Sequence, residues 1–148
     1  MSLTPSQAST LKTAIQGDTS VAAMVAAKDA NGIAANYNGP SSTQVWNKAT
    51  PADVIVAAIL PADFLALTTG GQLAVNAMLA GGSIDATNAN IQSWFTTVFS
   101  GKATTIANLT AAAKRAATKL EALFVTNSVT ALDGYSPTGS DVASAMGW

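Results

Sequence analysis

The sequence predicts an all-α fold, a compact multi-helix bundle with one long central helix and an irregular C-terminal tail. Three observations lead to this prediction. Alanine, the best helix former, dominates a chain of 148 residues that is 49% hydrophobic. Helix-start signals recur along the chain, each a hydroxyl or acidic side chain before an apolar stretch. Apolar residues then recur at helical spacing, most clearly over residues 103–124.

The first third of the chain predicts short helices bounded by turn residues. Thr4, Pro5 and Gln7 have the form of a capping box with proline at the first helical position. Asp18 and Thr19 provide the next start signal. In order, the expected segments are a helix over residues 5–16, a short helix from residue 19, an interruption at Asn31–Gly32, a short helix over residues 33–37 and a loop over residues 38–42.

The middle of the chain repeats the start signal at Thr50, where proline and an acidic residue follow the hydroxyl cap. Residues 54–60 are then expected to form a buried helix, and Pro61 opens another short one. Thr68 or Thr69 caps the next helix. Gly81–Gly82 stops it, because a glycine readily takes the left-handed conformation after a helix.

Two further helices are expected before the tail. Asp85 or Thr87 begins one whose apolar stripe contains Trp94, and Gly101 ends it. The long central helix spans residues 103–124, with Ile106, Leu109, Ala113, Ala117, Leu120 and Phe124 on one stripe and Lys114, Arg115, Thr118 and Lys119 mostly on the other side.

The expected domain organisation is a helical domain over residues 1–124 and a C-terminal extension over residues 125–148. Turn-forming residues dominate 126–128 and 133–139, and only residues 140–146 are expected to form a last turn of helix. The extension is nevertheless apolar in places. It therefore packs back on the domain or is received by a neighbouring subunit.

The low charge of the chain restricts its function. Only 10% of the residues are charged, against about 25% in an ordinary soluble domain. We therefore expect much of the surface to be covered by other subunits. Seven basic and eight acidic residues give a net charge of −1. Without a basic surplus to neutralise phosphates, direct or sequence-specific nucleic-acid binding is not expected.

The residues needed for catalysis are scarce. Histidine and cysteine are absent, so the familiar nucleophile and base pairs are missing. Asp53 and Asp63 would lie about 15 Å apart along one helix, and helix capping explains each of them better. The Gly70–Gly71 and Gly81–Gly82 pairs do not fit a phosphate-binding loop. We expect no enzyme activity, no catalytic residue, and no cofactor or metal site.

Neither an export signal nor a membrane span is expected. Residues 1–16 lack the continuous apolar core of a signal peptide. The longest apolar run, residues 54–60, is far shorter than the roughly 20 residues needed to cross a bilayer. The prediction is a soluble protein made in the cytoplasm, without membrane partners.

Three aromatic residues are candidates for interfaces between subunits. Trp46 follows a polar loop and serves either as an anchor within its own domain or as an interface anchor. Tyr135 and Trp148 lie in the C-terminal extension. A large aromatic side chain left in water would expose much apolar surface, so we expect these residues to pack on this chain or on a neighbour.

Several short motifs, taken in order, resemble those of a family of small proteins encoded among the virion genes of tailed bacteriophages. They cover most of the chain up to about Phe124. The motifs are Leu3-Thr4-Pro5, residues 33–38, Val45-Trp46, residues 50–53, residues 88–91, Phe99-Ser100-Gly101 and residues 114–124.

The resemblance implies a virion component without catalytic residues. For a helical protein of this size it implies an adaptor at the head-to-tail junction, a homo-oligomeric ring of identical subunits below the portal. The implied partners are identical copies, the portal, and other neck or tail proteins. The implied location is the virion, after synthesis in the host cytoplasm.

Other functions remain open from the residues alone. A helical binding or regulatory module could use an exposed apolar face to receive a partner peptide. Another capsid-associated or tail-associated virion protein would have the same composition. An enzyme that uses carboxylates alone is the third alternative.

Overall fold

The computed structural model describes residues 2–148 and shows a mixed α/β fold, so the all-α prediction is wrong. Helices account for 58% of the chain and strands for 14%, the strands forming three small antiparallel sheets. Each sheet contains two strands. Short strands escaped the sequence prediction because two to seven residues carry too little periodicity to be distinguished from loops.

The chain divides into two compact units, and the division differs from the boundary expected at residue 124. The described part of unit 1 comprises residues 2–44 and 116–148, and unit 2 comprises residues 45–115. The chain leaves unit 1 within strand β1 (Pro40–Trp46) and returns within β4 (Lys114–Thr118), and these two strands pair with each other. Unit 1 is therefore built from two separate segments of sequence.

Unit 1 contains the N-terminal helices and the C-terminal residues of the chain. The expected extension is not a separate part, because it contains two strands and a helix that belong to this unit. The elements besides β1 and β4 are α1 (Pro5–Gly17), η1 (Thr19–Val21), α2 (Ala22–Ala26), α3 (Ala30–Asn38), α9 (Lys119–Ala122), β5 (Val125–Thr126), β6 (Val129–Thr130) and α10 (Gly139–Met146).

Local capping explains where the N-terminal helices begin. The predicted capping box is confirmed at α1, where the Gln7 N–H donates to Thr4 Oγ1 and the Thr4 N–H donates to Gln7 Oε1. The interruption expected at Asn31–Gly32 is wrong, because α3 runs through it. Asp29 caps this helix by accepting a hydrogen bond from the Gly32 N–H at 2.8 Å. A well-placed cap outweighs the poor helix propensity of one glycine.

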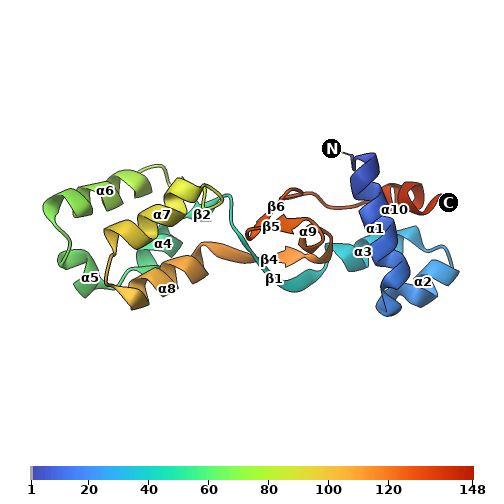
Figure 1. Ribbon diagram of the computed structural model, residues 1–148, viewed down its shortest axis with the longest axis horizontal. Helices are drawn as coiled ribbons and strands as arrows, with labels where there is room; N and C mark the ends of the chain where they lie inside the picture. The colour runs from blue at the N-terminus through green and yellow to red at the C-terminus, as the bar shows by residue number, and fades with distance from the viewer. Residues whose placement is uncertain (1) are drawn as a thin grey trace. The chain divides into compact units, whose positions relative to one another are not determined.

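The core of unit 1 forms where α10 packs against α3 and α1 (Figure 1). This core joins residues from both segments of the sequence. It includes Tyr37, whose side chain ends in a polar hydroxyl group. A Cβ atom at Gly139, the first residue of α10, would overlap the Asn31 side chain of α3, so any larger residue there must displace that side chain. The buried cluster consists of Leu11, Ile15, Val21, Ile33, Ala34, Tyr37, Leu120, Leu132 and Val142.

Unit 2 is mainly helical and contains one short two-stranded sheet, formed by β2 and β3. Its elements are β2 (Thr50–Pro51), α4 (Ala52–Ala58), α5 (Pro61–Leu65), α6 (Thr69–Leu79), β3 (Ser83–Ile84), α7 (Ala89–Val98) and α8 (Ala103–Ala112), together with the adjoining ends of β1 and β4.

The predicted helix starts in unit 2 are partly confirmed. Thr68 caps α6 by accepting a hydrogen bond from the Gly71 N–H at 3.1 Å. The cap expected at Thr50 is wrong, because Thr50 is buried in β2 opposite Ile84 of β3. The start expected at Asp85 or Thr87 is also wrong, because the cap of α7 is Asn88.

The core of unit 2 forms between α4, α7 and α8, and α8 contacts both of the other helices. Phe95 and Phe99 are its largest buried side chains. Trp94 packs edge-on against both rings, with centroid distances of 6.3 and 6.1 Å. The buried cluster consists of Ile55, Ala58, Ile59, Val75, Ile84, Ala86, Phe95, Phe99, Leu109 and Ala113.

The long central helix expected over residues 103–124 does not exist. Helix α8 ends at Ala112, β4 follows, and α9 begins at Lys119. The carbonyl of Ala113 accepts a hydrogen bond from the Asn47 N–H at 2.8 Å. An unbroken helix would use that carbonyl for its own next turn, so the contact with residue 47 ends the helix.

A second capping box explains why a new helix starts inside the expected one. The Glu121 N–H donates to Thr118 Oγ1, and the Thr118 N–H donates to Glu121 Oε2 at 2.8 Å. Glu121 is only 2% exposed, and its other oxygen accepts from the Gly134 N–H at 3.1 Å. The buried Glu121 carboxylate thus caps the helix that follows β4, and it also binds the backbone at Gly134, in the segment before α10.

We predict that Glu121→Gln lowers the free energy of unfolding by about 1–3 kcal/mol, because the amide has one oxygen and one of the two part-buried N–H groups, of Thr118 or Gly134, loses its acceptor. Urea unfolding followed by circular dichroism measures the change. The matched control is Gln7→Glu in the capping box of α1, which lies at the surface and should change stability by less than about 0.5 kcal/mol. Equal effects of the two substitutions would contradict the prediction.

The turn between β5 and β6 carries backbone strain. Asn127 and Ser128 connect the paired strands, and both have a positive φ, 52° and 60°. A two-residue hairpin turn of this kind favours glycine at the second position, where serine is unfavourable.

We predict that Ser128→Gly raises the free energy of unfolding by about 0.5–1 kcal/mol, because it removes the cost of a side chain in the left-handed conformation. Chemical denaturation provides the measurement. Ser128→Ala keeps the cost and should leave stability nearly unchanged. A stabilising alanine variant would show that turn strain is not the cause.

Candidate interaction surface

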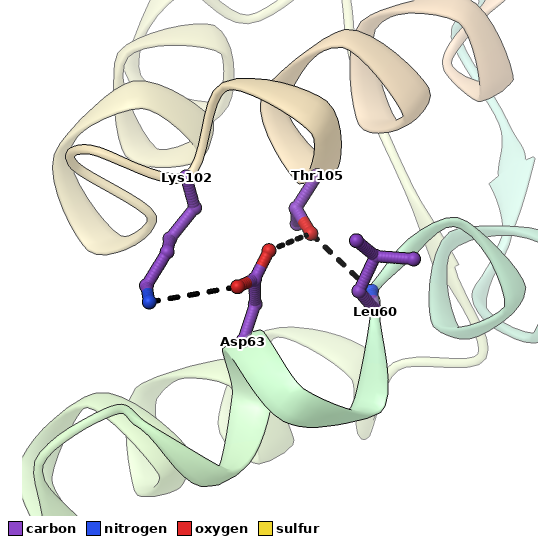
Figure 2. Close-up of polar contacts among 4 residues, drawn as sticks. All are labelled: Leu60, Asp63, Lys102 and Thr105. Carbon is purple, nitrogen blue, oxygen red and sulfur yellow. Dashed lines mark hydrogen bonds and ion pairs between the residues drawn. The ribbon is translucent and has the colours of Figure 1, made fainter.

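Polar contacts fix α5 against α8 in unit 2. The Thr105 hydroxyl of α8 donates to Asp63 Oδ2 of α5 at 2.6 Å and accepts from the Leu60 N–H at 3.3 Å. Lys102 lies just before α8, and its Nζ is 3.5 Å from Asp63 Oδ1 (Figure 2). Thr105 is fully buried. The cluster holds the start of α5, so its chemistry is structural.

A cavity of about 320 Å³ lies beside this cluster, between α4, α5 and α6. No charged side chain lines it. The lining residues are Val56, Ile59, Pro61, Phe64, Val75, Asn76 and Leu79, of which Asn76 is polar. The volume is near the lower end of the roughly 300–1,000 Å³ that is typical of small-ligand sites.

Exposed apolar side chains are concentrated in the helices whose residues line the cavity. Seven large hydrophobic residues are exposed within residues 2–148, and five of them lie in α4, α5, α6 and the α4–α5 junction. Leu65 is 73% exposed and Leu73 is 64% exposed. We call this surface the α4–α6 face. It consists of Val54, Val56, Leu60, Leu65 and Leu73 together with the residues that line the cavity.

The α4–α6 face is almost without charge. Residues 54–84 contain a single charged side chain, Asp63, which is paired with Lys102. Single exposed leucines are ordinary, but several of them on the helices that line a hollow indicate a candidate interaction site. The arrangement suits an apolar partner surface better than a charged or phosphorylated ligand.

The α4–α6 face was not among the predicted sites. The run of residues 54–60 was expected to be buried, whereas Val54 and Val56 are 40% and 53% exposed. The error has a physical cause, because a helix that is apolar on every side cannot be covered completely at the edge of a small unit. The sequence did contain a sign of this exposure, because the apolar run of residues 54–60 has no polar side that could face the solvent.

Trp46 lies in unit 2 and is partly buried. It packs against the core of that unit, and Lys114 Nζ lies 4.7 Å from the centroid of its ring. This is the geometry of a cation–π contact. The position fits the first of its two expected roles, an anchor within the domain.

Tyr135 and Trp148 lie in unit 1 and differ in exposure. Tyr135 packs against the core, whereas Trp148 is 37% exposed. None of the three aromatic candidates lines the cavity of the α4–α6 face. Their role in contacts between subunits therefore remains a prediction.

Comparison with known proteins gives no relative, since no protein-family model, curated protein or solved structure matches the chain. Within residues 2–148, no group of three or more His, Cys, Asp or Glu side chains is placed to hold a metal ion. Over the same residues, no helix combines the length and apolar character needed to cross a membrane. The candidate site thus rests on the composition and geometry of the α4–α6 face.

We predict that Thr105→Val lowers the free energy of unfolding by about 1–3 kcal/mol. Valine keeps the shape of threonine but leaves the part-buried Leu60 N–H without a partner and removes a donor to Asp63. Thr104→Val, at an exposed position one residue earlier, is the matched control and should have little effect. Thermal unfolding of the two variants side by side tests this, and similar losses would contradict it.

Tyr37 and Tyr135 make the stability of unit 1 sensitive to alkaline pH. Burial, and after it the Asp141 carboxylate, raise the pKa of Tyr135 to about 12. Burial and Asp18 likewise raise the pKa of Tyr37 to about 12. Burial opposes ionisation of Asp141, but hydrogen bonds from the Thr138 N–H and hydroxyl outweigh it and lower its pKa.

We predict that stability falls as the pH rises from about 10 to 12, because both tyrosines ionise in the unfolded chain at about pH 10 but stay neutral in the fold. Below pH 10 this contribution is fully present. Urea unfolding at pH 8 and pH 11.5 measures the loss. Tyr135→Phe should lose less stability over this range than the unmodified chain, and an equal loss would refute the prediction.

Proposed function

We propose that the chain is a structural subunit of a tailed-bacteriophage virion, an adaptor that forms a ring of identical copies below the portal. The observation that carries the proposal is the α4–α6 face, with five exposed aliphatic side chains and one paired charge. Burial of an apolar surface of this kind against a partner is favourable in water. In an assembly, the neighbouring subunits bury this surface permanently.

The low charge of the whole chain supports the same proposal. Charged residues make up 10% of the sequence, and charge is the property that keeps a free surface hydrated and separate from its neighbours. Surfaces buried between identical subunits do not need it. The chain contributes contacts and shape in this role, and no residue acts chemically.

The choice of particle rests on the motifs that resemble the phage virion family. Several of them are capping and turn positions. Thr4 caps α1, and residues 114–124 include the strand and capping box that return the chain to unit 1. A ring of this kind requires two different surfaces of each copy in contact, a contact that repeats from copy to copy until the circle closes.

A second candidate function follows from the cavity. Its apolar lining also suits an apolar peptide segment of a different protein, as in helix-in-groove recognition. Such a binding module would remain a monomer without its partner. The oligomeric state therefore distinguishes the two functions.

We predict that Leu73→Glu and Leu65→Glu each weaken self-association at least about tenfold, because each places a charge in an apolar contact. Analytical ultracentrifugation measures this, with the chain alone and with its portal protein. Thr96→Glu, at an exposed polar position of α7, is the matched control and should leave association unchanged. Mass spectrometry of intact particles should also detect the chain. A monomer under both conditions, with no copy in the particles, would refute the proposal.

A further inference from the structure

The chain contains two Asn-Gly pairs, and both lie at the ends of α3. Asn31 and Gly32 are in its first turn, and Asn38 and Gly39 are at its C-terminal end. In flexible chains this is the pair in which asparagine deamidates fastest, because glycine has no side chain to hinder approach to its backbone nitrogen. Each pair is therefore open to modification without an enzyme, and the surrounding fold decides whether it reacts.

The reaction at Asn38 needs only the next residue and water. The Gly39 backbone nitrogen loses its proton and attacks Cγ of Asn38, so an N–Cγ bond forms while the Cγ–Nδ2 bond breaks and the amide leaves as ammonia with that proton. Water then opens the resulting succinimide. Addition at Cγ gives aspartate, and addition at the backbone carbonyl of Asn38 gives isoaspartate, in which the main chain runs through Cγ.

Contacts with the C-terminal segment of unit 1 hold the reacting groups in the fold. Asn38 Nδ2 donates to the carbonyl of Pro137 at 3.0 Å, and Pro137 is buried. Gly39 is fixed on both sides, because its N–H donates to the carbonyl of Asn36 at 3.0 Å and its carbonyl accepts from the Lys119 N–H at 2.9 Å. The leaving amide and the attacking nitrogen are thus both engaged in hydrogen bonds while this segment is in place.

The other Asn-Gly pair is held by a local contact instead. Asn31 is exposed, but the Gly32 N–H donates to the Asp29 carboxylate at 2.8 Å in the N-terminal cap of α3. This cap does not depend on α10. Opening of α10 therefore releases Asn38 alone, whereas complete unfolding releases both asparagines.

We propose that Asn38 is a deamidation site that reacts with Gly39 when the segment around Pro137 separates from α3. The product disfavours reclosure, because aspartate and isoaspartate have no N–H to donate and place a negative charge opposite the Pro137 carbonyl. Within residues 2–148, Asn38 Oδ1 is buried and has no hydrogen-bond partner, so a charge there also lacks compensation. An opening of α10 is thereby made permanent in the chains that react.

One tryptic peptide tests the proposal. Lys28 and Lys48 bracket both asparagines, so the peptide of residues 29–48 carries the two sites, and fragment-ion mass spectrometry quantifies each separately. The full chain is incubated in mildly alkaline buffer with and without guanidinium chloride. We expect Asn38 to deamidate at least about fivefold faster than Asn31 in buffer alone, and the two to react at similar, higher rates in the denaturant.

Removal of one helix cap tests the dependence on α10. Thr138 caps α10 and adjoins Pro137 in the sequence. Thr138→Ala should raise the rate at Asn38 about fivefold and leave Asn31 unchanged, because loss of a cap favours opening of the helix that it starts. Thr68→Ala removes the cap of α6 in unit 2, and this matched control should change neither rate.

The effect of the product is measured separately. Asn38→Asp imitates the deamidated chain and should speed backbone amide hydrogen exchange in α10 at least about tenfold. Asn31→Asp is the matched control and should leave this exchange unchanged. It adds a carboxylate at an exposed position in the first turn of α3, where negative charge is favourable.

Any of three results would contradict the proposal. Equal rates at Asn31 and Asn38 in buffer alone would show that the reaction requires complete unfolding. An unchanged rate at Asn38 in Thr138→Ala, or no product there at all, would show that α10 does not control the site. Unchanged hydrogen exchange in Asn38→Asp would show that the product does not keep α10 open.

Discussion

The buried carboxylate of Glu121 is the interaction on which the return of the chain to unit 1 depends. It accepts hydrogen bonds from the backbone N–H groups of Thr118 and Gly134, and the carbonyl of the same residue accepts from the Thr130 hydroxyl. These contacts join the end of β4, the β5–β6 hairpin and the segment before α10. They fix the path of the chain from β4 to the segment before α10, which then packs against α1 and α3.

The capping signals explain how much of the fold could be predicted from the sequence. Thr4 and Thr68 were identified as caps because the chemistry of a helix start is local, whereas the same signal failed at Thr50, where pairing of β2 with β3 places the residue in a strand. The same signal at Thr118 and Glu121 was overlooked, since the apolar spacing of residues 103–124 also fits one long helix. Strand pairing at β1 and β4 depends on residues far apart in sequence, which no local pattern reveals.

The candidate site was harder to predict than the fold. The shortage of charge drew attention to the surface, but three aromatic residues were singled out and the aliphatic side chains of α4, α5 and α6 were not. Leu65 and Leu73 look like core residues in the sequence. Whether a leucine is covered depends on how many neighbours a small unit can place around it, and that number is known only from the structure.

The division of unit 1 into two segments has a consequence for synthesis of the protein. A chain emerging from the ribosome completes residues 45–115 before it delivers residues 116–148, so unit 2 has all its parts first. Leu11 and Ile33 must wait for Leu120, Leu132 and Val142 before their cluster is closed. The N-terminal helices therefore stay incompletely covered until residues 116–148 have been synthesised, and a nascent chain that lacks these residues leaves the cluster accessible to proteases and chaperones.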